Sequence, residues 1–308
     1  DVVSVAPDNV WAVGLMTSTK TFSWENGNAD TSPLIEHWDG RQWNTVPSPS
    51  LVSFTSSLTK LVALNANDIW AIGSYINTSG RHGLIEHWDG HAWDIVSHPS
   101  QSNEVFFGIA ALSPDDIWVV GTKDAKDGQL IEHWDGKQWG IVPGPNPGER
   151  VNFLTGITAL SANNVWIAGI STVDHPTSPT TFNTEMLFEH WDGKRWSSIF
   201  GPPVTTTQNF INVAYVFDLA TLAPNDIWAI GSTQLAPTQT NPPNWLLAHW
   251  DGQHWSLASD PDSHIYAGLV GMTRDPSSPG KLWIVGSRAS DPFGKNAASA
   301  STLIETNR

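Results

Sequence analysis

The chain has 308 residues with 15 basic and 30 acidic side chains, which gives a formal net charge of −15 and disfavours nucleic acid and anionic membrane surfaces as partners. It contains no cysteine, so disulfides and thiolate metal sites are excluded. No apolar run reaches the roughly 18 residues that a membrane-spanning helix needs, so we expect no membrane insertion.

Two short motifs alternate along the chain. The first to appear is "DNVWAVG" at 8–14, and its tryptophan recurs every 48 to 62 residues. This spacing is typical of propeller blades. The tryptophans of the successive copies are Trp11, Trp70, Trp118, Trp166, Trp228 and Trp283.

The second motif is "LIEHWDGRQW" at 34–43, with near-identical copies that start at 84, 130, 187 and 246 and a partial copy, "LIETNR", at 303–308. Its Asp-Gly pair supplies the positive φ angles that tight hairpin turns require, so the motif predicts a β-hairpin. Repetition argues for architecture, because a catalytic centre is usually built once in a chain.

Each repeat predicts four short strands, in the order A to D. Strand A is an apolar stretch such as "LTKLVAL" at 58–64, strand B carries the first motif, strand C is "LIEHW", and strand D begins at the motif's second tryptophan. No segment has a helical period. The prediction is an all-β, six-bladed β-propeller of four-stranded antiparallel blades, with the last blade lacking its outer strand. The blades span about 1–48, 54–98, 104–145, 151–201, 210–259 and 264–308.

The tandem units resemble those of bacterial β-propellers with "DIWAVG" and "HWDGxxW" repeats, and they are distantly similar to the tectonin, Kelch and Asp-box propeller families. The resemblance covers the whole chain and implies a single propeller domain over 1–308. It implies little about function, because propellers serve as lectins, enzymes and adaptors alike.

The repeated histidines suggest a metal site at first sight. Equivalent positions on different blades are spread around a ring, however, and cannot converge within the roughly 2 Å bonding distance of one ion. We therefore predict that each imidazole bonds a backbone carbonyl or an acidic side chain of a neighbouring strand. The repeated glutamates share this structural interpretation. The histidines are His37, His87, His133, His190 and His249, and the glutamates are Glu36, Glu86, Glu132 and Glu189, with Ala248 in the fifth copy.

Irregular loops gather at one end of such blades. The A–B and C–D turns lie at one end, whereas the B–C loops, at 15–33, 170–185, 232–244 and 287–301, lie at the other with the D–A connections. Variable loops on a rigid scaffold usually carry recognition. Tryptophans there can stack on sugar rings or anchor a protein partner, or they can simply cap a blade edge. The candidate ligand-binding residues are Trp24, Tyr75, His82, His175 and Trp245.

Catalysis is not predicted. The innermost strands carry Lys60, Gly108, Gly156, Asp218 and Gly268 at equivalent positions. Asp218 is thus the one carboxylate with a claim to a channel-facing role, whereas ordinary glycoside hydrolysis needs a pair. We expect a protein that is not an enzyme and has no cofactor; calcium bound by loop residues stays open.

The sixth blade ends in strand C, so the edge at Leu303, Ile304 and Glu305 lacks a partner in the sequence. Either the sequence is a trimmed piece, the simpler explanation, or another chain adds the strand, as in a homo-polymer. The start at Asp1, the missing cysteine and the Ser/Thr/Pro-rich loops predict a secreted or cell-surface protein. The favoured function is a recognition module for a glycan or protein ligand; the alternative is a structural assembly subunit.

Overall fold

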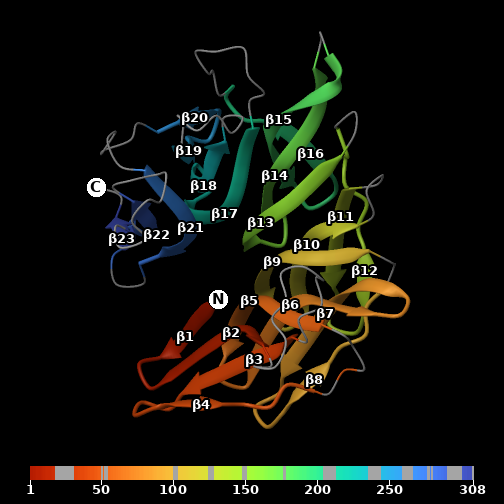
Figure 1. Cartoon of the computed structure of the whole chain (residues 1–308), viewed down its shortest axis with the longest axis vertical. Helices are drawn as coiled ribbons and strands as arrows, with labels where there is room; N and C mark the ends of the chain where they lie inside the picture. Colours follow the sequence, from red (N-terminus) through yellow and green to blue (C-terminus); the bar gives the residue numbers. More distant parts are fainter. Residues whose placement is uncertain are drawn as a thin grey trace. The chain divides into compact units, whose positions relative to one another are not determined.

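The computed structural model is all β in the part of the chain that it describes, as the sequence predicts. The chain folds as two compact units, Asp1–Gly144 and Pro145–Arg308 (Figure 1). None of the described segments forms a helix long and apolar enough to cross a membrane. The structure describes residues 1–17, 31–49, 51, 55–99, 103–123, 128–147, 151–175, 178–203, 213–234, 244–258, 266–275, 278, 280–289 and 300–306.

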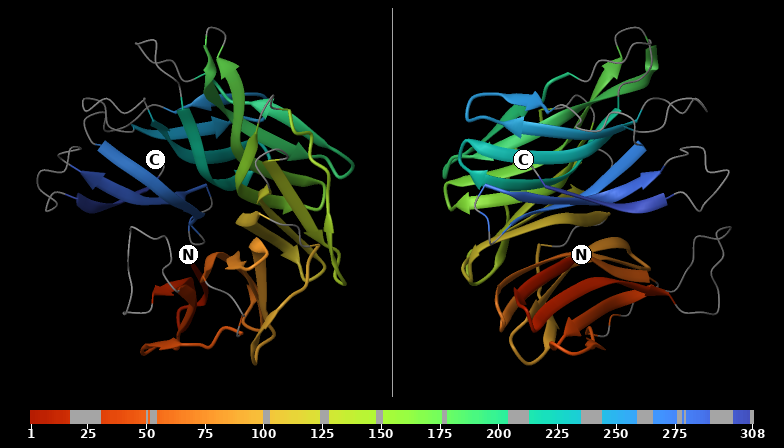
Figure 2. Two further views of the ribbon diagram at one scale, coloured as in Figure 1. Left: turned by 45° about the vertical axis from the view of Figure 1, so that its right-hand side comes forward. Right: turned by 90° about the vertical axis from the view of Figure 1, so that its left-hand side faces the viewer.

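The first unit contains three sets of four antiparallel strands that follow one another along the chain (Figure 2). Set 1 is β1 (Val2–Ala6), β2 (Asn9–Thr17), β3 (Thr31–Trp38) and β4 (Trp43–Thr45). Set 2 is β5 (Thr55–Asn65), β6 (Asp68–Asn77), β7 (Gly80–Trp88) and β8 (Trp93–Ile95). Set 3 is β9 (Glu104–Ser113), β10 (Asp116–Lys123), β11 (Gly128–Trp134) and β12 (Trp139–Ile141). A single parallel pairing of Thr31 with Thr55 joins sets 1 and 2 into one sheet.

The second unit repeats this pattern. Set 4 is β13 (Asn152–Ser161), β14 (Asn164–His175), β15 (Ser178–Trp191) and β16 (Trp196–Phe200). Set 5 is β17 (Val213–Ala223), β18 (Asp226–Gln234), β19 (Asn244–Trp250) and β20 (Trp255–Leu257). Set 6 is β21 (Tyr266–Arg274), β22 (Leu282–Ala289) and β23 (Ala300–Thr306), so among the described residues it has three strands.

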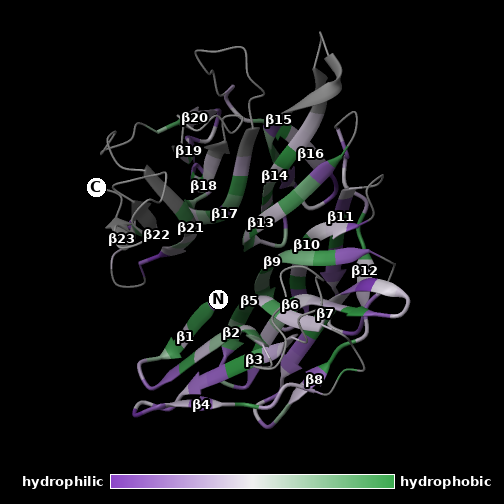
Figure 3. Ribbon diagram, viewed as in Figure 1, coloured by the Kyte–Doolittle hydropathy of each residue, from purple (hydrophilic) through white to green (hydrophobic). Residues whose placement is uncertain are grey.

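Neighbouring sets of one unit bury apolar side chains between them, and Figure 3 shows hydrophobic residues along strands such as β9 and β13. Set 2 is covered on both faces in this way, by sets 1 and 3, which explains why its strands are nearly continuous apolar runs. Between sets 2 and 3, the ring of Trp70 lies 5.4 Å from that of Trp134 and 5.8 Å from that of Trp139. Trp11 and Trp166 pack in the same way on the tryptophan pairs of sets 2 and 5.

The glycines of the Asp-Gly turns have the positive φ angles that the sequence predicts. In set 3, Trp134 pairs with Trp139 across a four-residue turn, and Gly136 has a φ of +87°. A Cβ atom on Gly136 would lie 2.3 Å from Oδ1 of Asp115, in the turn between β9 and β10. Glycine is therefore required both by backbone conformation and by the close approach of the two turns.

One predicted loop is wrong. The B–C connection predicted at 170–185 is mostly a long β-hairpin, because β14 continues to His175 and β15 starts at Ser178. Threonine and β-branched residues in "ISTV" and "TTF" favour extended backbone, which overrides the loop-like impression of the prolines nearby.

The repeat tryptophans are not equally buried, although their place in the repeat suggests that all of them are core residues. Trp118 and Trp93 are 3% and 4% exposed, but Trp43 is 46% and Trp283 is 40% exposed. Within the first unit, set 1 packs against set 2 through the face that carries Trp11, and Trp43 lies on the other face. Trp283 stands in set 6, on the face of β22 that the cluster between sets 5 and 6 does not use.

Candidate ligand-binding face

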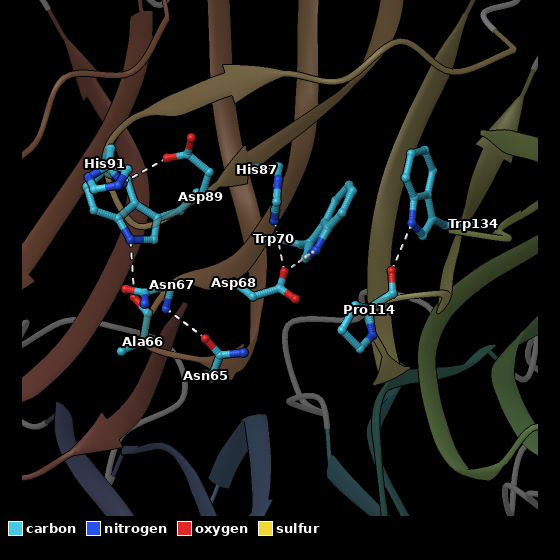
Figure 4. Close-up of polar contacts among 11 residues, drawn as sticks. Asn65, Ala66, Asn67, Asp68, Trp70, His87, Asp89, His91, Pro114 and Trp134 are labelled. Carbon is cyan, nitrogen blue, oxygen red and sulfur yellow. Dashed lines mark hydrogen bonds and ion pairs between the residues drawn. The ribbon is translucent and has the colours of Figure 1, made fainter. Parts of the chain in front are cut away.

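The "HWDG" motif forms a polar hub with the strand that precedes it. In set 3, the indole Nε1 of Trp118 donates to Oδ1 of Asp116 at 2.9 Å, and Nε2 of His133 lies 2.8 Å from the same oxygen. The rings of Trp118 and His133 pack at a centroid distance of 4.1 Å. Figure 4 shows the same arrangement in set 2, where Trp70 and His87 both point at Asp68. An acidic partner on the neighbouring strand is one that the sequence predicts for these histidines.

The hub does not depend on a carboxylate. In set 1, Oδ1 of Asn9 accepts from Trp11 at 2.8 Å and lies 3.0 Å from Nε2 of His37. Because an amide oxygen only accepts, Nε2 of His37 carries the proton. A neutral amide and a carboxylate can thus each bind both the tryptophan and the histidine, which is typical of a scaffold contact and not of acid–base chemistry. The hubs of sets 4 and 5 use Asn164 with His190 and Asp226 with His249.

The aspartates of the Asp-Gly turns accept hydrogen bonds from backbone N–H groups. Oδ1 of Asp135 accepts the N–H groups of Gln138 and Lys137, both at 2.9 Å. These two bonds hold the pKa of the Asp135 carboxyl below its usual range, although partial desolvation opposes them. The carboxylate of Asp135 therefore holds the Asp-Gly turn in place.

Three of the four glutamates of the motif, Glu86, Glu132 and Glu189, are buried, whereas Glu36 is half-buried. Glu86 and Glu132 have no exposed surface. Ser48, in the connection after β4, donates through Oγ to Oε1 of Glu86 at 2.9 Å, and burial raises the pKa of Glu86 to about 7. In the next connection, Nδ1 of His98 lies 3.4 Å from Oε1 of Glu132. Each connection therefore ties one set to the glutamate of the set that follows.

Tyr75 and His82 come together at the opposite end of set 2. They pair directly across the β6–β7 hairpin, and their rings stack at a centroid distance of 5.1 Å with an interplanar angle of 27°. Ser79 in the hairpin turn places Oγ 2.8 Å from Nε2 of His82. Both rings are half-buried, and Tyr75 rests on the apolar cluster between sets 1 and 2.

This arrangement suits a polyhydroxylated ligand. The stacked pair offers an aromatic surface, on which the C–H face of a sugar ring can pack. Asn77 and Ser79 lie in the same hairpin and supply amide and hydroxyl groups for hydrogen bonds to hydroxyls. The sequence predicts Tyr75 and His82 separately, but only the strand register shows that they are one pair.

The other predicted ligand-binding residues do not join this pair in one described site. Trp24 lies outside the described residues. His175 pairs through its backbone with Ser178 at the tip of the β14–β15 hairpin, and its side chain is likewise outside what the structure describes. Leu303, Ile304 and Glu305 are in β23 and pair with β22, and nothing is described of their side chains.

Trp245 is not the solvent-facing platform that the sequence suggests. It belongs to β19, where it pairs with Ser232, and it is half-buried against the apolar cluster of sets 5 and 6 that includes Ala220 and Leu269. Strand C starts at Asn244 in this set, so Trp245 falls at a core-facing strand position and not in the loop before it.

Asp1 is a second carboxylate at the position of Asp218 in the repeat, one that was not predicted from the sequence. Asp1 exchanges backbone hydrogen bonds with Val13, two residues beyond Trp11, which makes it equivalent to Asp218. Oδ2 of Asp1 accepts the N–H of Leu61 at 3.0 Å. The signal was present in the distance from Asp1 to the first tryptophan, but Asp1 lies directly before β1, which is only five residues long.

Both carboxylates bind backbone of the following set. Oδ2 of Asp218 accepts the N–H of Met272 at 3.2 Å, as Asp1 does from Leu61. In set 6, the equivalent residue is Gly271, which pairs with Val285, and not the predicted Gly268, because the connection between β21 and β22 is longer than the corresponding turn of the other sets. Among the described residues, no group of three or more His, Cys, Asp or Glu side chains is arranged to hold a metal ion.

No protein-family model matches the chain, and no curated protein sequence matches it. Solved structures do. A polysaccharide lyase, the ulvan lyase bound to -[GlcA(1-4)Rha3S]-, is 11% identical with a TM-score of 0.57, over 98% of this chain and 77% of the lyase. The N-terminal domain of Nup159 is 11% identical with a TM-score of 0.46, over 100% and 76% of the two chains. A mutant Aleuria aurantia lectin in complex with Fucα1-6GlcNAc is 14% identical with a TM-score of 0.43, over 98% and 93%. These structures are β-propeller-like, and the likeness to the lyase supports that fold for the present chain.

Proposed function

We propose that the chain is a non-catalytic recognition module that binds glycans at the end of the sheets where the β6–β7 hairpin lies. The stacked pair of Tyr75 and His82 carries this proposal, because it is a half-buried aromatic surface flanked by hydroxyl and amide groups. The location that fits such a module is the cell surface or the extracellular space.

Two further observations support a role without catalysis. Asp1 and Asp218, the carboxylates of the innermost strands, each accept a backbone N–H from the following set. The repeated histidines work equally with Asp116 and with Asn164 as partner, so their hubs need no ionisable acceptor.

A glycan array with variant proteins tests the proposal. Tyr75→Ala and His82→Ala should each weaken binding about 10-fold or more, in line with the roughly 1.4 kcal/mol per factor of ten and the worth of an aromatic contact. Tyr75→Ala should also lower the melting temperature, because the ring packs on the cluster between sets 1 and 2, so binding is measured well below the melting temperature of each variant. His91→Ala, which removes an exposed histidine from the turn at the other end of set 2, is the matched control and should bind like the parent. Failure of the parent to bind any sugar on a broad array would remove the proposal.

We propose further that the six sets form one propeller domain with six blades. Each set would then have a neighbour on both faces, and Trp43 would be as well covered as Trp93. Trp43→Ala should in that case cost about as much stability as Trp93→Ala, roughly 3 to 5 kcal/mol. A cost for Trp43→Ala below about 1 kcal/mol, with the usual cost for Trp93→Ala, would show that set 1 keeps an open face.

A second candidate function is assembly by strand addition at set 6. Among the described residues, β23 pairs with β22 and set 6 has three strands, whereas the other sets have four. A strand from another subunit, or from residues outside this sequence, would complete the blade and satisfy its backbone groups. Light scattering at increasing protein concentration and electron microscopy test assembly between subunits. Strand addition would be contradicted if the protein stays monomeric at high concentration and its source contains no longer version of the chain.

A further inference from the structure

The β6–β7 hairpin carries a sequence pattern that neither the fold nor the proposed function uses. Asn77-Thr78-Ser79 is the single Asn-x-Ser/Thr triplet, with x other than proline, in the 308-residue sequence. This triplet is the acceptor pattern for N-linked glycans. It lies at the tip of a hairpin, where Asn77 pairs with Gly80 and the two residues between them are exposed.

The side chains of the triplet are already arranged around the acceptor amide. Oδ1 of Asn77 accepts the backbone N–H of Ser79 at 2.8 Å and its hydroxyl at 2.6 Å. Nδ2 of Asn77 donates to no protein group in the part of the chain that the structure describes, so the nitrogen that would be glycosylated is unoccupied. Asn77 is half-buried at the hairpin tip, and the hydroxyl of Ser79 holds its amide oxygen.

We propose that Asn77 is an acceptor site for an N-linked glycan, and that the first sugar of this glycan packs on the stacked rings of Tyr75 and His82. The sugar donor is one activated as a diphosphate ester and delivered by a glycosyltransferase. Nδ2 attacks the anomeric carbon, the bond from that carbon to the phosphate oxygen breaks, and the diphosphate leaves. Nδ2 loses one proton to a base of the transferase.

The strand register places the attached sugar over the rings. Side chains two residues apart in a strand point to the same face, so Asn77 and Tyr75 share a face of β6. His82 pairs directly with Tyr75 and therefore lies on that face too. A sugar linked to Nδ2 starts next to the stacked pair, and its C–H face can cover the aromatic surface without a separate binding event.

The inference goes beyond the proposed function; it rests on the proposed cell-surface or extracellular location but not on glycan binding. An attached sugar and a free glycan would compete for the same rings, so the modified protein should bind free glycans less well than the unmodified one. The array test uses unmodified protein, whereas the tests below ask whether Asn77 is modified and where its sugar lies. Either idea can fail without the other.

Intact mass tests the modification. When the full chain is directed through the secretory pathway of cultured animal cells, we expect one N-glycan per molecule, removed by a peptide N-glycosidase and located at Asn77 by peptide mapping. Asn77→Gln and Ser79→Ala should abolish the added mass. Thr78→Ala leaves the acceptor pattern intact and should retain it. A secreted, folded parent without sugar on Asn77 would overturn the proposal.

Melting temperatures test the packing of the first sugar. The glycosylated parent should melt about 2 °C above the Asn77→Asp variant, which is the form that enzymatic removal of the glycan leaves. In a Tyr75→Ala background, the glycosylated and Asn77→Asp forms should melt together. A gain from the glycan that is the same with and without the Tyr75 ring would refute the contact between sugar and ring.

Discussion

Nε2 of His133 lies 2.8 Å from Oδ1 of Asp116, the same oxygen that accepts the indole N–H of Trp118. The relationship recurs wherever the "HWDG" motif is complete, with Asp or Asn as acceptor. In set 6 the acceptor position is Lys281 and the histidine position is Thr306, and Trp283 is exposed there. The Asp or Asn acceptor and the histidine are thus either both present in a set or both replaced, as expected for two residues that bind each other.

His133→Ala should destabilise the protein without affecting any binding activity. The change leaves Asp116 without one of its donors and removes a ring that packs on Trp118, at a cost of about 1 to 3 kcal/mol. Chemical denaturation measures this directly. Asp116→Asn is the matched control, because asparagine serves in sets 1 and 4, and it should cost less than about 1 kcal/mol. Equal losses for both variants would mean that the negative charge matters after all.

Gly136→Ala should destabilise the turn of set 3. The residue has a φ of +87°, and an added Cβ atom would meet Oδ1 of Asp115 at 2.3 Å. Strain and displacement together should cost about 1 to 3 kcal/mol. Gly140 lies four residues on, in β12, with nothing within 4 Å of an added Cβ atom. Gly140→Ala should therefore be nearly neutral, and thermal melts of the pair should separate clearly.

Glu86 should make the protein less stable as the pH rises. Burial raises its pKa from 4.5 to about 7, so the folded protein holds this proton more tightly than the unfolded chain does. The free energy of unfolding should fall between these two pH values, by about 3 kcal/mol at most, and then level off. Glu86→Gln should remove this fall. Ser48→Ala, which deletes a bond that favours the carboxylate, should extend the fall to higher pH. Urea denaturation across this range would show a flat parent profile if the carboxylate were well solvated.

His98 should also make the protein less stable as the pH rises, because its protonated imidazolium is the form that the folded protein stabilises. Burial alone would lower its pKa, but the hydrogen bond and charge of Glu132 outweigh burial and raise it above 6.5. The stabilisation is therefore complete below 6.5, the value of the unfolded chain, and is lost as the pH rises through the folded pKa. A proton NMR titration of His98 measures that pKa. His98→Gln should flatten this part of the profile, whereas His91→Gln, at an exposed turn, should leave it unchanged.

Much of the fold could be predicted because the strand-B motif recurs six times in the sequence. The strand-B tryptophans, the short outer strands and the positive φ angles of the Asp-Gly glycines are all found where the two motifs predict them. The errors arise where one set departs from the rest. The longer connection between β21 and β22 puts Gly271, and not Gly268, at the equivalent position of set 6, and the long β14–β15 hairpin has no counterpart in set 3.

The candidate site was harder to predict for a physical reason. Tyr75 and His82 are seven positions apart, and nothing in their spacing shows that they face each other until the register of β6 and β7 is known. Trp245 was misplaced by a single strand boundary, since one residue of extra strand turns a loop position into a core-facing one. The hub acceptors were visible as an Asp or Asn two residues before each strand-B tryptophan, but their role needs the pairing across the hairpin.

Ligand-induced chemical-shift changes test most directly whether recognition lies at the β6–β7 hairpin while the "HWDG" motifs are scaffold. The protein, labelled with 15N, is titrated with the glycan that binds best on the array, and the indole, imidazole and amide signals are followed. The changes should concentrate on His82, Ser79 and the amide of Tyr75, with Trp118 and His133 unchanged. Changes confined to the hub of Trp118 and His133, with none at His82, would contradict this division of the molecule.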